Sequence, residues 1–411
     1  MDYIPPVSPS SDLFRSFWMA GFESACHVNS CGERLDMIAA TQHDCFVRED
    51  YARLRGFGIR SVRDTVRWHL IERSGGFDFS SMDPMLDAAR ESGVQVVWDL
   101  CHYGWPDDLD IFAPAFVDRF ARFAGAVARH VRDSSDEVPF YTPINEISFF
   151  AWAAGEVGWF HPFCKGRGGD LKRQLVRSCV AAIEAVWEAD PRARIVTVEP
   201  VINVVPPKGR RDRNGMAAGY HASQYEAWDM LAGLRDPELG GHARYLDVMG
   251  VNFYHDNQWE HPGGRKIAWH IKPRDKRWKP FHKMLGEAYE RYRRPIFVAE
   301  TSHVGSGRAE WIRELTGELR LALAAGIPLE GACLYPIIDR FEWNDPTHWH
   351  NSGLWDYDIQ GDGTFTRVLN EEYAAEFRRC QQQLAEALEA GSCGAGRAVT
   401  VDEASPAGAE A

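Results

Sequence analysis

Two glutamates stand alone at the ends of short apolar runs, Glu146 in TPINE and Glu300 in FVAE. A carboxylate buried at the end of an apolar strand is costly unless it has a partner or a use. Hydrolysis of a glycosidic bond uses two such groups, one on each side of the bond. One carboxyl must be protonated to donate to the leaving oxygen, and the other must be ionised to attack the anomeric carbon. The pair therefore indicates glycoside chemistry.

A third residue, Arg63 in VRDTVRW, offers a way to separate the pKa values of the two carboxyl groups. A guanidinium beside Glu300 would hold that group ionised. The negative charge of Glu300 would then raise the pKa of Glu146. Covalent attack by Glu300 would remove the charge, and Glu146 would change from an acid to a base.

The segments that would position these groups alternate along the chain between short apolar runs and longer amphipathic stretches. Strand–helix alternation implies a parallel sheet with helical crossovers, and eight repeats favour a closed barrel over an open sheet. The α/β fold class expected is therefore a single (β/α)8 TIM barrel. The eight expected strands are Phe17–Ala25, Ile59–Arg67, Val94–Cys101, Val138–Asn145, Arg194–Glu199, Leu246–Asn252, Pro295–Glu300 and Leu329–Tyr335.

The clearest amphipathic stretch is Pro114–Arg132, in which apolar residues recur every three or four positions and Pro114 suits a helix start. The other expected helices are Ser81–Ser92, Leu171–Ala189, Ala217–Ala232, Phe281–Arg293 and Glu310–Ala325. In a (β/α)8 barrel, reactive groups lie at the carboxyl ends of the strands. Besides Arg63 and the two glutamates, those ends supply His102, Asn145, Asn252, Tyr254, Glu342 and Trp343.

These strand ends resemble motifs of glycoside hydrolase family 1, whose members are retaining glycosidases on (β/α)8 barrels. The similarity spans roughly residues 17 to 360, and six motifs occur in the family's order. TPINEI is similar to T-F-N-E-P, FVAET to V-T-E-N-G, VRDTVRW to Y-R-F-S-I-S-W, DLCHYGWP to T-L-Y-H-W-D-L-P, GVNFY to G-x-N-Y-Y, and YPIIDRFEW to W-S-L-L-D-N-F-E-W.

The resemblance implies roles for individual residues. Glu146 corresponds to the acid/base, and Glu300 corresponds to the nucleophile. Arg63 and Tyr254 would contact the nucleophile, and Asn145 would bind the sugar 2-hydroxyl. The other implied substrate-binding residues are His102, Asn252, Tyr335, Glu342 and Trp343.

Departures from the family motifs gather in the expected sugar pocket. Ile147 replaces the proline after the acid/base, Thr301-Ser302 replaces Asn-Gly after the nucleophile, and Tyr335 replaces a tryptophan. The family's first-strand glutamine has no clear counterpart, although Glu23 and His27 stand nearby. The two glutamates and Arg63 match the family motifs, so these departures bear on which sugar is bound and not on the reaction.

Composition excludes several other classes of protein. The net charge of −13 disfavours nucleic acid and anionic membrane surfaces as partners. Nine scattered cysteines, without a CxxC pair or a basic and apolar leader, favour a reducing cytoplasmic location. No apolar stretch is long enough to cross a membrane. No cofactor or metal is expected, because His348 and His350 lack further ligands at zinc spacing; their loop is expected at the cleft rim, presenting Trp349.

Residues 1–390 are expected to form the catalytic domain, and 391–411 a disordered Gly/Ala-rich tail. The stretch 205–215 is expected to be a charged, solvated loop.

The function predicted is a retaining β-glycosidase, β-glucosidase-like by default, acting on a small glycoside or oligosaccharide. A 6-phosphorylated sugar is disfavoured because Glu342 would repel phosphate. A transglycosidase with the same residues and a non-catalytic sugar-binding barrel remain alternatives, and the oligomeric state is left open.

Overall fold

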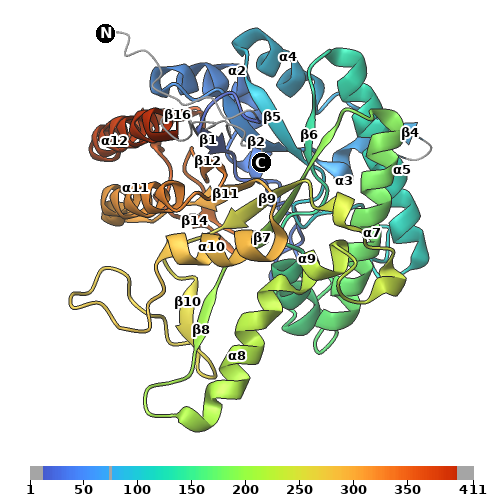
Figure 1. The fold of residues 1–411 in the computed structure, drawn as a ribbon. Helices are drawn as coiled ribbons and strands as arrows, with labels where there is room; N and C mark the ends of the chain where they lie inside the picture. Colours follow the sequence, from blue (N-terminus) through green and yellow to red (C-terminus); the bar gives the residue numbers. More distant parts are fainter. Residues whose placement is uncertain (1–12, 74–75, 396–411) are drawn as a thin grey trace, which may run out of the picture.

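The computed structural model describes residues 13–73 and 76–395. Within these residues, eight parallel strands close into a barrel, and their order around the barrel follows their order along the chain (Figure 1). The barrel strands are β1 (Trp18–Gly21), β2 (Ser61–Thr65), β5 (Gln95–Asp99), β6 (Phe140–Thr142), β7 (Arg194–Pro200), β9 (Val248–Asn252), β11 (Ile296–Thr301) and β12 (Leu329–Leu334). The protein is therefore a (β/α)8 TIM barrel, as the sequence predicts.

Helices surround the barrel and connect its strands. They are α1 (Met37–Ala40), α2 (His43–Leu54), α3 (Trp68–Ile71), α4 (Asp83–Ser92), α5 (Pro114–Ser134), α6 (Ile147–Phe150), α7 (Gly168–Ala189), α8 (Asn214–Ala222), α9 (Glu226–Leu231), α10 (Phe281–Tyr292), α11 (Arg308–Ala324) and α12 (Glu371–Ala395). Short two-stranded sheets decorate the loops. They pair β3 (Glu72–Arg73) with β4 (Gly76–Phe77), β8 (Asn203–Val205) with β10 (Gln258–Glu260), β13 (Phe341–Glu342) with β14 (Asp345–Trp349), and β15 (Trp355–Ile359) with β16 (Phe365–Leu369).

One expected helix is wrong. The segment Ala217–Ala232 is not continuous, because a 3-10 turn at Ser223–Tyr225 separates α8 from α9. The Ser223 hydroxyl donates to the carbonyl of Tyr220, and the Gln224 amide donates to the carbonyl of His221. Such side-chain bonds compete with the helical backbone pattern and break the helix locally.

Helix α12 was not among the expected helices, and it continues through residues 391–395, which the sequence had placed in the disordered tail. Residues 396–411, the remainder of that expected tail, lie outside the described residues. The helix begins directly after β16, where the Asn370 side chain accepts from the backbone N–H of Tyr373. Phe377 of the helix packs edge-on against Trp18 of β1, with the ring centroids 5.1 Å apart. The helix thereby covers the first barrel strand.

The barrel interior is filled by branched and aromatic apolar side chains. Val196 and Val198 of β7, Val248 of β9 and Phe297 of β11 belong to this cluster. Gly250 lies among them, and a Cβ atom there would come within 2.8 Å of Val198 Cγ2. The interior below the carboxyl ends of the strands is thus a packed core that supports the site above it.

A buried charge network ties α2 to the barrel and to the C-terminal hairpin. His43 of α2 contacts Asp50 through Nδ1 and Asp64 of β2 through Nε2, both at 2.9 Å. Arg367 of β16 binds the same Asp50 at 2.9 Å. Burial alone would lower the pKa of His43, but the two carboxylates outweigh it and raise the pKa to about 9.

This network predicts a pH-dependent contribution to stability. A histidine whose folded pKa is raised above about 6.5 stabilises the fold fully below that pH, and the contribution is lost as pH rises through about 9. We expect the unfolding free-energy difference between wild type and His43→Gln to shrink by on the order of 3 kcal/mol from about pH 6 to about pH 9.5. Denaturant unfolding at both pH values measures it, with exposed His348→Gln as the control. Parallel pH profiles for wild type and His43→Gln would contradict the assignment.

Candidate active site

Glu146 follows β6 and occupies an unusual backbone conformation. Its φ of 47° and ψ of 61° lie in the left-handed region, which non-glycine residues rarely adopt. The backbone N–H of Glu146 donates to the carbonyl of Val198 in β7 at 3.0 Å. Strained backbone of this kind persists only where the surroundings hold it, and it clusters at functional sites.

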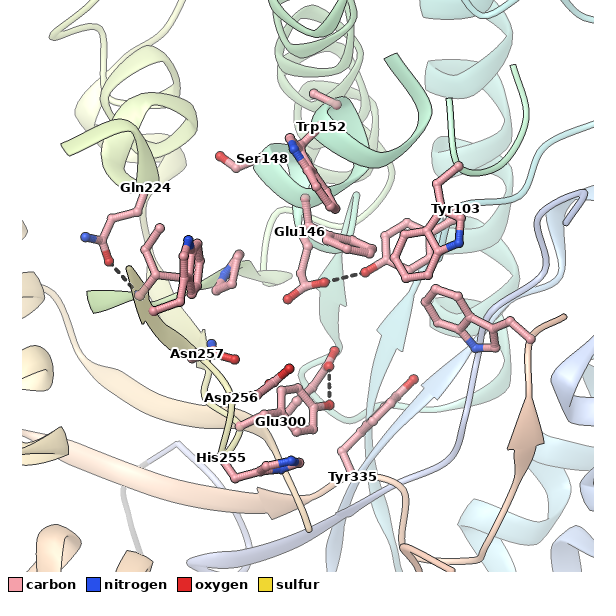
Figure 2. Close-up of a pocket in the computed structure, with 18 of the residues that line it drawn as sticks. Tyr103, Glu146, Ser148, Trp152, Gln224, His255, Asp256, Asn257, Glu300 and Tyr335 are labelled. Atoms are coloured by element: carbon pink, nitrogen blue, oxygen red, sulfur yellow. Dashed lines mark hydrogen bonds between the residues drawn. The ribbon is translucent and has the colours of Figure 1, made fainter. Parts of the chain in front are cut away.

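The carboxyl group of Glu146 is buried and has two donors. The Tyr103 hydroxyl donates to Oε2 at 2.5 Å (Figure 2). Nδ2 of Asn252 donates to Oε1 at 2.9 Å. Burial raises the pKa of Glu146 to about 7, and the negative charge of Glu300 adds to the rise. The two hydrogen bonds oppose this increase without cancelling it. Glu146 can therefore hold or release a proton near neutral pH.

Glu300 lies at the carboxyl end of β11, and each of its oxygens accepts a hydrogen bond. Arg63 Nη1 donates to Oε1 at 3.0 Å, and the Tyr254 hydroxyl donates to Oε2 at 2.8 Å. Burial raises the pKa of Tyr254 well above its usual value, and the charge of Glu300 raises it further, so this hydroxyl keeps its proton to donate. These two donors, a guanidinium and a phenol hydroxyl, suit an ionised carboxylate.

Arg63 is fully buried and organises the floor of the site. Its Nη2 donates to Asp99 Oδ2 at 2.7 Å and to Asn145 Oδ1 at 3.1 Å. Asp99 also contacts Nδ1 of His102 at 3.1 Å. Burial alone would lower the pKa of His102, but the hydrogen bond with Asp99 and the negative charges of Asp99, Glu300 and Glu23 together outweigh it and raise the pKa. The network fixes the ring of His102 under the cavity.

A cavity of about 1070 Å³ opens above this floor. Seven of the predicted residues line it: His102, Glu146, Tyr254, Glu300, Tyr335, Glu342 and Trp343. Three others, Arg63, Asn145 and Asn252, are fully buried behind the lining and contact it through hydrogen bonds. The structure thus brings all ten predicted residues to one place.

Tyr335 and Glu342 lie on the wall supplied by β12 and the loop after it. Gly21 of β1 leaves room for the Tyr335 ring, because a Cβ at that glycine would lie 2.1 Å from the ring atom Cδ2. The Tyr335 ring stacks parallel to His102, with centroids 5.9 Å apart. Glu342 Oε1 contacts His350 Nε2 at 2.5 Å.

Glu23 and His27, whose roles the sequence left open, occupy different environments. Glu23 lines the cavity and forms an ion pair with Arg340 at 2.9 Å. His27 lies behind the wall, with its ring 4.8 Å from that of Trp343. Burial, and then the charge of His102, lower the pKa of His27 to about 3, so this ring is neutral. Glu23 is therefore the one of the two that a ligand would meet.

Tryptophans in the segments after β5 and β6 lie in two different environments. Trp152 and Trp159 line the cavity and remain 39% and 43% exposed, which leaves indole surface for a ligand. Trp105 is buried, and its indole N–H donates to the carbonyl of Leu109. The expectation that Trp349 is presented at the cleft rim is wrong. Trp349 lies on β14, packs against Tyr357 and is not part of the cavity lining.

Three residues of the site were missed in the sequence. Asp99 and Tyr103 lie close to His102 in the sequence. Asp99 accepts from Arg63, and Tyr103 donates to Glu146. Glu199 of β7 is buried, and both its oxygens accept from the backbone N–H of Ser148, at 3.2 and 3.0 Å. Burial raises the pKa of Glu199 to about 8. A polar residue ending a strand was the available signal for Asp99 and Glu199.

Residues 13–73 and 76–395 contain no group of three His, Cys, Asp or Glu side chains placed to hold a metal ion. No helix in the same part of the chain is long and apolar enough to cross a membrane.

Comparison with known proteins relates the chain to others through its fold. No protein-family model matches it, and no curated protein matches it in sequence. The AHE enzyme from Alicyclobacillus herbarius has a similar structure, with a TM-score of 0.72, 17% identity, and coverage of 94% of this chain and 100% of that enzyme. The family 1 β-glucosidase from Thermotoga maritima has a TM-score of 0.70 at 15% identity, covering 89% of this chain and 97% of its own. At these identities the likeness is one of fold.

The coupling between the two carboxyl groups can be tested without any substrate. Glu300→Gln should lower the pKa of Glu146, because it removes a neighbouring negative charge. Tyr103→Phe should raise it, because it removes a donor to the carboxylate. Carbon-13 NMR titration of labelled glutamate side chains measures both shifts, and Glu342→Gln serves as the control. Equal titration of Glu146 in all variants would contradict the coupling.

Proposed function

We propose that the protein is a retaining β-glycosidase that hydrolyses a small β-glycoside or oligosaccharide through a covalent glycosyl-enzyme intermediate. The observation that carries the proposal is the unequal environment of two carboxyl groups in one cavity. Glu146 has a pKa raised to about 7, whereas Glu300 accepts from a guanidinium and a phenol. One group is suited to donate a proton and the other to attack as an anion.

In the first step, a carboxylate oxygen of Glu300 bonds to the anomeric carbon while the bond to the leaving oxygen breaks. Glu146 transfers its proton to that leaving oxygen. Formation of the ester removes the negative charge of Glu300, which had helped to raise the pKa of Glu146. The pKa of Glu146 therefore falls, and the group, which lost its proton in the first step, is an ionised carboxylate. It takes a proton from a water molecule while the oxygen of that water bonds to the anomeric carbon and displaces Glu300.

The remaining residues would bind and orient the sugar. In this proposal His102, Glu342 and Trp343 contact its hydroxyl groups, and Tyr335 forms part of the wall. Asn145 holds His102 and Tyr103 in place from behind the lining. Trp152 and Trp159 supply exposed indole faces for the leaving group. The Thermotoga maritima proteins of similar fold are described as β-glucosidases, with complexes of deoxynojirimycin and glucoimidazole. This supports a β-glucoside as the first substrate to test. The pocket of this protein also contains the ion pair of Glu23 and Arg340, which a bound sugar would meet.

The catalytic assignment is tested by substitution. On a good nitrophenyl β-glycoside, Glu146→Gln should lower kcat/KM by roughly 10²- to 10⁴-fold, and Glu300→Gln by at least about 10⁴-fold. A 2-fluoro glycoside should label Glu300, which peptide mass spectrometry would locate. If either variant keeps full activity, the assignment fails. Sugar binding with neither turnover nor labelling would instead identify a non-catalytic sugar-binding barrel.

The proposed roles also predict how kcat/KM depends on pH. The first step needs Glu146 protonated, so kcat/KM should fall as pH rises through about 7. The two groups interact, so this value belongs to the coupled pair. Stopped assays with a nitrophenyl glycoside measure the profile. A dinitrophenyl glycoside, whose leaving group needs little protonation, should lose far less activity at alkaline pH. An identical alkaline fall for both substrates would argue against Glu146 as the acid.

A further inference from the structure

Two loops beside the cavity carry a concentration of positive charge. They comprise residues 205–214 and 261–279, and together they are called the basic arm. The arm contains eleven lysines and arginines but two aspartates, in a chain of net charge −13.

The two loops of the arm continue from β8 and β10, which pair in parallel. Arg277 Nη1 donates to the carbonyl of Pro206 at 2.9 Å, and Lys208 pairs with Asp275, so the loops lie together. Figure 1 shows β8, β10 and α8 projecting from the barrel.

The charge of the arm is only partly neutralised. Acidic residues outside the arm pair with four of its basic groups, through Asp256, Glu260, Glu287 and Glu314. Within the described residues, four exposed basic side chains of the arm have no ion pair: Arg211, Arg265, Lys272 and Lys276. The arm therefore presents a positive field on an otherwise acidic protein.

The arm is continuous with the cavity. Gly264 and Lys266 of the arm line it, as does Trp259 of β10. Lys266 Nζ lies over the Trp259 ring, 5.0 Å from its centroid. In Figure 2, Gln224 and Asp256 lie on the opposite side of the pocket from Tyr335, with Glu146 and Glu300 between them. Asp256 pairs with Lys266. A chain with its terminal unit beside Tyr335 would therefore leave the cavity towards the arm.

The two ends of this path differ in charge. Glu23, Glu300 and Glu342 line the cavity on or near the wall of Tyr335. Arg340 offsets the charge of Glu23, and the carboxylates of Glu300 and Glu342 would disfavour an anionic sugar at that end. Beyond the cavity, the unpaired cations of the arm favour anionic groups. The path thus selects a chain that is neutral at its terminus and negative further along.

We propose that the basic arm binds the negatively charged units of an acidic glycan, whose neutral terminal sugar occupies the cavity. The inference rests on the proposed glycosidase function and specifies its substrate class. The recognised groups are carboxylates or sulfates, which bind lysine and arginine in the same way. Each exposed ion pair is weak, so recognition draws on several units at once and weakens with salt.

Calorimetric binding to the whole protein tests the proposal. The probes are hexagalacturonate, a heparin-derived hexasaccharide and neutral cellohexaose, which separate carboxylate from sulfate recognition. The arm variant carries Arg211→Glu, Arg265→Glu, Lys272→Glu and Lys276→Glu. A matched control carries the same charge change on exposed arginines of α5, α7 and α11 that have no ion pair in the described residues: Arg122→Glu, Arg129→Glu, Arg177→Glu and Arg320→Glu.

We expect an acidic hexasaccharide to bind more tightly than cellohexaose and to lose at least roughly tenfold in affinity in the arm variant. The control variant and the binding of cellohexaose should be little affected. Equal binding of acidic and neutral probes, or equal losses in both variants, would overturn the proposal. So would preferential binding of single-stranded DNA or of anionic phosphatidylserine vesicles.

The same variants keep this inference separate from the proposed function. Turnover of a neutral nitrophenyl glycoside reports on the cavity alone, and we expect the arm variant to retain it. Absence of turnover in wild type, with binding at the arm intact, would reject the glycosidase. Normal turnover without acidic-glycan binding would reject the substrate class.

Discussion

The buried guanidinium of Arg63 is the interaction on which the site depends. It is 0% exposed and contacts Glu300, Asp99, Asn145 and the carbonyl of Ala299. A charge removed from water is tolerated only where opposite charge and hydrogen bonds surround it. Those partners come from the carboxyl ends of β5, β6 and β11, whereas Arg63 comes from β2. Closure of the barrel is what brings these strand ends within reach of one another.

The two central carboxyl groups differ because their neighbours differ. Glu300 accepts from the guanidinium, while Glu146 accepts from a phenol and an amide. Strand β7 supports Glu146 from behind, since Val198 accepts from its N–H and Glu199 accepts from that of Ser148. Identical side-chain types thereby acquire different proton affinities, which is the property that a two-carboxylate mechanism requires.

The cavity and the segments around it are unequal in charge. Carboxylates gather beside Tyr335, where the barrel supplies the wall, and cations gather on the loops that extend β8 and β10. The barrel strands are constrained by the packed barrel interior, whereas these loops lie outside it and are anchored in the outer core by Ile267, Trp269 and Trp278. Loop variation on a fixed barrel is therefore where the preference for a particular ligand would be set.

The sequence by itself determined the strand order, most helices and the ten clustered residues. Apolar runs, helical spacing and strand-end motifs are local patterns, so they can be recognised in the sequence without knowledge of the fold. Tertiary structure decided the burial of Trp105 and the partners of Asp99, Tyr103 and Glu199. It also decided that Glu23 faces the cavity and His27 does not. These outcomes depend on contacts between segments far apart in the chain, and only closure of the barrel establishes those contacts.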